Sequence, residues 1–397
     1  MGAYAATSEE IMNIRRVGGN VLASLRAGFC LSMLSGSFNT RTWASALLPR
    51  FMRPSGALLI VVASFLCRGD LLAAENDAGK SSAPLSRLLR GQFDWQCTEP
   101  LVSAAKRPED LCYSIKDPSV VYYENRWHLF CTIRSQKRTH QIEYLSFADW
   151  KDAQAAPRHL LTITNGYFCA PQVFYFSPHG KWYLIYQIAD GPRKMLQPAF
   201  STSLNVADPE SWTAPVRLYA KHPENVKAWI DFWVICDAAK AHLFFTSNNG
   251  LMWRAETKLE DFPFGWNKPQ VVLTDDIFEA GHTYRLRGST QFLTVIEAQA
   301  EGRRYYKAYL AERLDGEWKP LAASKEHPFA SPVNVHEGRH WTDSFSHGEL
   351  LRAGYDQNLE IDAANLRFLF QGVSDPARAG KTYGEIPWQL GMLSLTP

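Results

Sequence analysis

The chain has 397 residues, with 42 Lys or Arg against 40 Asp or Glu, so its formal net charge is only +2. This balance, without a long basic run or the spacing of a zinc finger or a helix-turn-helix motif, argues against a nucleic-acid partner. The length allows two average domains or one large all-β domain. Aromatic residues make up 13% of the chain, which is enough to fill an apolar core and to line a groove for a neutral substrate.

The N-terminal region has the layout of a secretory signal peptide. Residues 57–66 read ALLIVVASFL, an apolar run too short to span a bilayer comfortably. Arg53 precedes this run, and the small-residue segment 72–74 follows it as a cleavage site. We therefore expect residues 1–74 to be a leader with a signal peptide, with Met52 as an alternative translation start. The expected protein is secreted, extracellular or periplasmic, and free of the membrane after cleavage; a membrane anchor is the alternative.

The cysteines do not show the spacing of a metal cluster, since no CxxC or Cys/His motif of the zinc type is present. Cys97 and Cys112 are close enough in sequence to close a short loop through a disulfide in an oxidising compartment. Cys131, Cys169 and Cys236 lie within apolar, strand-like stretches, and we expect them to be buried thiols.

Beyond the leader, the pattern is that of an all-β domain. The mature chain is expected to start near residue 75, and residues 75–92 are small, polar and charged, as in a linker. From residue 93 onward, helical periodicity is almost absent, and short β-rich runs alternate with Gly, Pro, Asn and Asp. Residues 93–397 are therefore predicted to form the folded domain.

A loose internal repeat divides this domain into five units. In each unit a polar or small residue starts a strand, a turn follows, and an apolar strand returns; these starts lie at positions 117, 171, 231, 279 and 347. Units of this size, each with a few short strands, indicate the blades of a five-bladed β-propeller. Residues 387–395 would supply the strand that closes the ring. A β-sandwich is the alternative fold.

Three acidic residues occupy equivalent starts of three repeats: Asp117, Asp231 and Glu279. In a propeller these positions converge on one mouth of the central channel. Apolar neighbours flank each acid, and burying an unpaired carboxylate among them is costly. Two carboxyl groups across a groove can hydrolyse a glycosidic bond, one as acid and one as base or nucleophile. A third would raise the pKa of the acid by like-charge repulsion. The alternative is that each acid simply caps a turn.

Eight short motifs between residues 93 and 397 resemble those of glycoside hydrolase family 62, and they occur in the family's order. They are Lys116–Val121, Ala170–Phe176, Trp229–Asp237, Phe278–Ala280, Val295–Ala298, Gly302–Tyr306, Ser346–Glu349 and Pro387-Trp388. The resemblance implies a five-bladed α-L-arabinofuranosidase that removes arabinofuranosyl side groups from arabinoxylan or arabinan with inversion of configuration. It also implies that Asp117 is the general base, Glu279 the general acid and Asp231 the residue that adjusts the acid's pKa and orients it.

The same resemblance implies further site residues, each of which also has a purely structural alternative. Lys116 would lie at the arabinose pocket beside the base. The other expected pocket residues are Gln172, Glu297, Arg304 and Tyr383. His347 lies in the motif that approaches a calcium ion in the central channel; calcium prefers oxygen ligands, so such an ion would be structural and held mainly by water. The chemistry itself requires no cofactor, and we expect a monomer.

One departure from the family concerns Tyr186-Gln187, where the family often offers an aromatic residue next. Here residues 188–194 read IADGPRK, a basic insertion, which changes the surface expected to bind the main chain of the polysaccharide. Two other functions remain open at this point. One is a related hydrolase of the family 43 kind, acting as a xylosidase or arabinanase. The other is a propeller that binds glycan without cleaving it.

Overall fold

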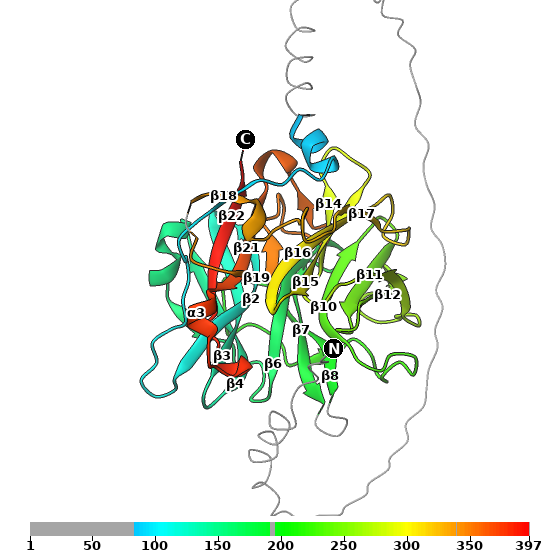
Figure 1. Cartoon of the computed structure of the whole chain (residues 1–397). Coiled ribbons are helices and arrows are strands. Elements are labelled where there is room, and N and C mark those ends of the chain that lie inside the picture. The colour runs from blue at the N-terminus through cyan, green and yellow to red at the C-terminus, as the bar shows by residue number, and fades with distance from the viewer. Residues whose placement is uncertain (1–82, 191–194, 339, 397) are drawn as a thin grey trace, which may run out of the picture. The chain divides into compact units, whose positions relative to one another are not determined.

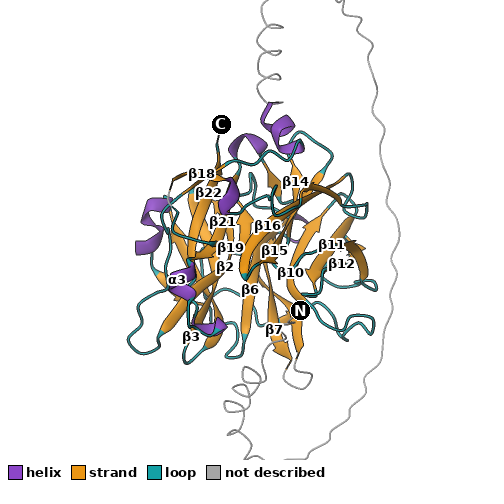
Figure 2. Cartoon of the chain, in the orientation of Figure 1, coloured by secondary structure: helices purple, strands orange, loops and turns teal. Residues whose placement is uncertain are grey.

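Strands dominate the computed structural model, which describes residues 83–190, 195–338 and 340–396 (Figure 2). These residues belong to one compact unit, residues 77–397. The expected leader and signal peptide, with the question of the start at Met52, lie outside the described residues. Within the described part, no helix is long and apolar enough to cross a membrane.

Twenty-two strands of the described chain form five sheets, which are the five blades (Figure 1). Blade 1 consists of β2 (Cys112–Tyr123), β3 (Arg126–Ser135), β4 (Thr139–Phe147) and β5 (Arg158–Leu160). Blade 2 consists of β6 (Phe168–Phe176), β7 (Lys181–Asp190), β8 (Met195–Ser203) and β9 (Val216–Arg217). Blade 3 consists of β10 (Ile230–Cys236), β11 (Lys240–Thr246), β12 (Leu251–Lys258) and β13 (Gln270–Thr274). Each of these sheets is antiparallel and follows the order of the chain.

Blades 4 and 5 have five strands each. Blade 4 consists of β14 (His282–Leu286), β15 (Phe292–Ala300), β16 (Arg303–Ala311), β17 (Lys319–Ala322) and β20 (Glu360–Ile361). Blade 5 consists of β19 (Ser344–Leu350), β21 (Arg367–Val373), β22 (Gln389–Leu395), β1 (Trp95–Cys97) and β18 (Val335–Gly338). The short helices between strands are η1 (Trp150–Ala155), η2 (Ser177–His179), η3 (Pro332–Asn334), η4 (Ala363–Asn365), α3 (Asp375–Arg378) and η5 (Tyr383–Glu385).

Blade 5 closes the ring by joining the two ends of the domain. The N-terminal strand β1 pairs antiparallel with the C-terminal strand β22 and parallel with β18. The first strands of neighbouring blades pack against one another, with β2 between β19 and β6. The prediction of a five-bladed propeller, closed by a strand within residues 387–395, is therefore confirmed, and the β-sandwich alternative is wrong.

A left-handed residue lies within the first strand of each blade or, in blade 4, two residues before that strand. The backbone φ is positive at five such residues, one per blade: Asp117 (47°), Ala170 (53°), Asp231 (54°), Ala280 (54°) and His347 (21°). Four of them coincide with shifts of the strand register, as in a β-bulge. Non-glycine residues rarely adopt this conformation, which costs about 1–2 kcal/mol each. The repeat starts predicted from the sequence fall on these positions or within one residue of them.

Each of these left-handed residues donates its main-chain N–H to a side chain of the preceding blade. The acceptors are Gln371 for Asp117 (2.8 Å), Thr132 for Ala170 (2.8 Å), Gln187 for Asp231 (3.1 Å), Asp231 for Ala280 (3.0 Å) and Glu297 for His347 (2.9 Å). A bulge leaves these N–H groups without a partner in their own sheet, and burying them unpaired would be costly. The five bonds therefore hold the strained positions in place and join each blade to the next.

Gln172 joins two blades in the same way, so its expected role as a pocket residue is not supported. Its amide nitrogen donates to the carbonyl oxygen of Val234 at 3.0 Å, and its amide oxygen accepts from the N–H of Val234 at 2.7 Å. The side chain is 1% exposed. Both polar ends of this side chain are therefore used between blades 2 and 3.

The linker expected at residues 75–92 is wrong from residue 83 onward. Residues 83–89 form a helix, because Leu85, Leu88 and Leu89 line one apolar face at helical spacing. Leu88 is fully buried in the main hydrophobic core, and the other two leucines pack against that core. The helix is therefore part of the folded domain.

The disulfide suggested for Cys97 and Cys112 does not form. Both residues are free thiols, because they lie on β1 and β2, which belong to different blades. Burial raises the pKa of the Cys97 thiol to about 12. The remaining described cysteines, Cys131, Cys169 and Cys236, are buried thiols as predicted.

Replacing Gln172 by Leu should destabilise the domain without removing a contact to substrate. The change leaves a buried N–H and a buried carbonyl of Val234 unpaired, at a cost of about 3 kcal/mol. Chemical denaturation should show this loss in the free energy of unfolding, and KM should stay near that of the unaltered protein. An unchanged free energy of unfolding with a raised KM would instead show that Gln172 contacts the substrate.

Candidate active site

Three buried side chains from three blades meet in the central channel. Nδ1 of His347 lies 3.1 Å from Oδ1 of Asp117 and 3.7 Å from Oδ2 of Asp231. All three side chains are less than 10% exposed. Each is the left-handed residue in the first strand of its blade. The left-handed backbone at these three positions, in blades 1, 3 and 5, therefore brings the side chains together.

The imidazole of His347 carries a proton at neutral pH. Burial alone would lower its pKa, but Asp117 and Asp231 outweigh burial and raise the pKa to about 9. The resulting cation acts on its neighbour: burial would raise the pKa of Asp117, yet the charges of His347 and Lys116 hold that pKa well below its usual range. Asp117 is therefore ionised, which is the state that a general base needs.

Lys116 lies beside this base and under an aromatic ring. Its Nζ is 4.9 Å from the centre of the Tyr383 ring, a cation–π distance, and the side chain is buried. Burial opposes the ammonium charge, but Tyr383 and Asp117 outweigh it and raise the pKa of Lys116. Tyr383 itself is 47% exposed, so the ring presents a free surface at the site.

Glu279 lies in a second group of side chains with a different charge state. Its Oε1 lies 3.3 Å from Nη1 of Arg304, and its Oε2 accepts a hydrogen bond of 2.8 Å from Nδ2 of Asn248. Burial raises the pKa of Glu279; Arg304 opposes this effect, while Asp231 and Glu297 add to it. Glu279 therefore keeps its proton at higher pH than an ordinary glutamate, as a general acid requires.

Glu297 links several groups of the site through its two carboxylate oxygens. It is fully buried and pairs with Arg304, whose guanidinium also lies over the ring of Phe278. Its Oε2 accepts hydrogen bonds from Oγ of Ser346 at 2.7 Å and from the N–H of His347 at 2.9 Å. Glu297 is thus a fully buried member of the cluster that links Arg304 to His347, and Arg304 also contacts Glu279.

The two groups are joined into one site by short links. Oδ2 of Asp231 accepts from the N–H of Ala280, the residue after Glu279, and Glu297 bridges Arg304 and His347. Of the site residues predicted from the sequence, all except Gln172 thus belong to one connected cluster. This cluster can hold an ionised and a protonated carboxyl group at the same pH, which is the pairing that glycoside hydrolysis uses.

Several residues that contact the site were not predicted as site residues from the sequence. Asn248 contacts the acid, and Cys169 accepts a hydrogen bond from Gln187 at 3.3 Å and contacts Tyr167. Gln187 also accepts from the N–H of Asp231. Asn248 lies in the sequence Asn-Asn-Gly, which predicts a turn. Nothing in that pattern predicted its hydrogen bond to Glu279.

The described residues contain no group of three or more His, Cys, Asp or Glu side chains arranged to hold a metal ion. The rings of His347 and His282 lie 6.3 Å apart. Nδ1 of His282 is buried and has no hydrogen-bond partner among the described residues. Burial lowers the pKa of His282, which keeps the ring neutral, and a neutral imidazole is the form that binds metals.

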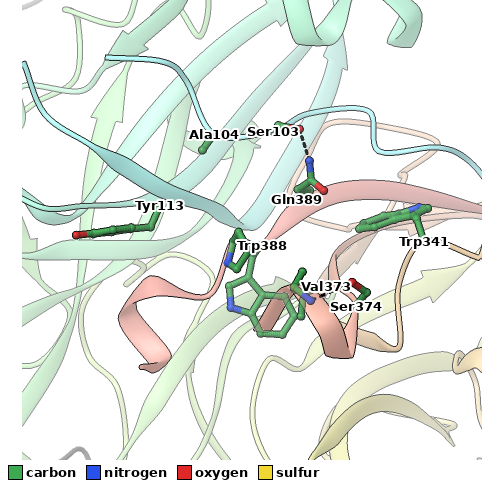
Figure 3. A pocket seen from close by; sticks show the side chains of 10 residues that line it. Ser103, Ala104, Tyr113, Trp341, Val373, Ser374, Trp388 and Gln389 are labelled. Atoms are coloured by element: carbon green, nitrogen blue, oxygen red, sulfur yellow. Dashed lines mark hydrogen bonds between the residues drawn. The ribbon is translucent and has the colours of Figure 1, made fainter. Parts of the chain in front are cut away.

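A cavity of about 270 Å³ lies outside this cluster (Figure 3). Its lining includes three aromatic residues, Tyr113, Trp341 and Trp388, together with Ser103, whose hydroxyl accepts a hydrogen bond from Gln389. No residue of the catalytic cluster lines the cavity. The carboxyl groups of the cluster therefore do not line this cavity.

Comparison with known proteins finds relatives among the glycoside hydrolases. Alpha-L-arabinofuranosidase C of Cellvibrio japonicus (strain Ueda107) is 38% identical over 317 residues, covering 77% of this chain and 48% of that protein. The chain thus spans about half the length of this curated relative.

Two solved structures match this chain over nearly their whole length. The catalytic domain of a Coprinopsis cinerea GH62 alpha-L-arabinofuranosidase superposes with a TM-score of 0.73 and 37% identity, over 77% of this chain and 98% of that one. A GH62 hydrolase in complex with xylotriose superposes with a TM-score of 0.71 and 35% identity, over 76% of this chain and 97% of that one.

The sequence model described as Glycosyl hydrolase family 62 matches residues 95–394, which is nearly the whole propeller. The resemblance seen in the sequence motifs is thereby confirmed, and the chain belongs to glycosyl hydrolase family 62.

Proposed function

We propose that this chain is an α-L-arabinofuranosidase that removes arabinofuranosyl side groups from arabinoxylan or arabinan. One observation carries the proposal: a single channel holds Asp117, whose pKa is lowered, and Glu279, whose pKa is raised. A base and an acid can therefore coexist at one pH. Relatives with 37–38% identity that are named as arabinofuranosidases support the choice of sugar.

In the proposed mechanism, Asp117 removes a proton from a water molecule as that water attacks the anomeric carbon. Glu279 donates its proton to the glycosidic oxygen of the leaving xylan or arabinan chain. Asp231 contributes in two ways: its charge raises the pKa of Glu279, and its Oδ2 holds the N–H of Ala280 beside the acid. The whole displacement takes one step, and the configuration at the anomeric carbon is inverted.

The substrate is proposed to enter between Lys116 and the acid. Lys116 and Arg304 offer N–H donors to the hydroxyl groups of the arabinose. The exposed ring of Tyr383 offers a face for the main-chain sugar to which the arabinose is attached. The complex of a relative with xylotriose supports xylan as the main chain of the substrate. The chain's membership of family 62 favours this reading over a hydrolase of the family 43 kind.

Secretion, a monomeric state and a structural calcium ion complete the proposal. Calcium would lie in the channel near His347, held mainly by water oxygens and not by the protonated ring of His347 itself. The ion would fix the geometry of the channel, while the proton transfers described above need only the side chains.

The proposal predicts release of free arabinose from arabinoxylan with the xylan main chain intact. The assay incubates the chain from residue 75 onward with arabinoxylan and, in parallel, with debranched arabinan, and identifies the released sugars. Release of xylose or of arabino-oligosaccharides would contradict the proposal and indicate the activities of the family 43 kind. Binding without any release would indicate a glycan-binding propeller.

In the same assay, Asp117→Asn and Glu279→Gln should each lower kcat/KM by about 100- to 10,000-fold, since each removes a proton-transfer group. Circular dichroism should show that both variants keep the fold. Loss of folding in Asp117→Asn would instead support a role for that residue in capping the strand.

Activity should fall at high pH as Glu279 loses its proton. Its pKa is raised, so the protonated form persists above the usual range of glutamate and is lost as the pH rises through the raised value. Asp231→Asn removes a negative neighbour and should lower the pKa of Glu279, which moves the basic limb of the kcat/KM profile to lower pH. A basic limb at unchanged pH in this variant would show that Asp231 does not raise the pKa of Glu279.

A further inference from the structure

We propose that Asn248 is a positioning residue for the general acid, and that its amide stabilises the carboxylate which remains after Glu279 has given up its proton. The role rests on the proposed function, because it concerns the same proton transfer. Asn248 is exposed at the surface, whereas the side chain of Glu279 is only 13% exposed.

The amide completes a pair of donors around the acid. Nδ2 of Asn248, from the turn between β11 and β12 in blade 3, lies 2.8 Å from Oε2 of Glu279. Nη1 of Arg304, from β16 in blade 4, lies 3.3 Å from Oε1. Each oxygen of the acid thus has its own donor, and Asn248 makes the shorter of the two contacts.

The turn that carries Asn248 is built to keep the amide in place. Asn248 has a left-handed φ of 56°, which asparagine tolerates better than most residues. Gly250 has a φ of 84°, and a Cβ there would lie 2.7 Å from the carbonyl oxygen of Asp275. The N–H of Asp275 in turn donates to the carbonyl oxygen of Gly250 at 3.1 Å. The turn is therefore bonded directly to the segment that leads to Glu279.

The hydrogen bond from Asn248 strengthens as the reaction proceeds. In the ground state Oε2 belongs to a neutral carboxylic acid; when the O–H bond of Glu279 breaks and its proton joins the glycosidic oxygen, the carboxylate becomes negative. A hydrogen bond to a charged acceptor is about twice as strong as one to a neutral acceptor. An interaction that is stronger in the transition state than in the ground state raises kcat and leaves KM nearly unchanged.

The proposed role of Asn248 distinguishes two kinds of substrate. A sugar hydroxyl is a poor leaving group and needs the proton from Glu279, whereas p-nitrophenolate leaves without one. Loss of Asn248 should therefore affect arabinoxylan and spare p-nitrophenyl α-L-arabinofuranoside. A loss of stability or a displaced channel would affect both substrates alike.

The test compares Asn248→Gly with the unaltered chain on both substrates. Glycine removes the amide and accepts the positive φ without strain. We expect kcat on arabinoxylan to fall about 10- to 100-fold, the value of one hydrogen bond to a charged group, with KM unchanged. On the aryl substrate we expect less than about a threefold loss, because no proton transfer to the leaving group is needed.

Asn249→Ala is the matched control, since it removes the neighbouring exposed amide, whose oxygen accepts from Oγ of Ser247 and does not contact Glu279. It should leave both activities unchanged. Equal losses on the two substrates in Asn248→Gly, or a raised KM with an unchanged kcat, would overturn the positioning role. An unaltered chain that releases arabinose from neither substrate would overturn the proposed function itself, and the role of Asn248 with it.

Discussion

The site depends on five main-chain N–H groups that the first strands cannot bond within their own sheets. Each belongs to a left-handed residue, and each donates to a side chain of the preceding blade. The left-handed turn directs Asp117, Asp231 and His347 into the channel, and the neighbouring blade fixes them there. The same bonds thus join neighbouring blades and hold the side chains of the candidate site in the channel.

The charges of His347 and Lys116 distinguish the carboxyl group of Asp117 from that of Glu279. The imidazolium of His347 contacts Asp117 and lies near Asp231, so it stabilises the ionised base directly. Glu279 has no such contact; burial and two nearby carboxylates raise its pKa against the opposing charge of Arg304. The two carboxyl groups therefore have different pKa values because His347 and Lys116 together outweigh burial at Asp117, whereas Arg304 does not outweigh burial and the nearby carboxylates at Glu279.

Much of this could be predicted from the sequence, and the failures have physical causes. The repeat starts, the three acids and the closing strand could be found because strained, channel-facing positions recur once per blade. The role of Gln172 could not, since a glutamine at a strand start has the same pattern whether it binds sugar or an adjacent blade. The helix at residues 83–89 was missed because its three leucines lie next to a polar, linker-like stretch. Asn248 was missed because its contact with Glu279 spans two blades.

The anomeric form of the first arabinose released tests the central claim most directly, namely that Asp117 activates water while Glu279 protonates the leaving oxygen. Proton NMR during the first minutes of arabinoxylan hydrolysis distinguishes the two anomers before they equilibrate. The account predicts that β-arabinofuranose is released first, since a single displacement inverts the α-linkage. Release of the α-anomer first would indicate a covalent intermediate, which would contradict the assignment of Asp117 as a general base.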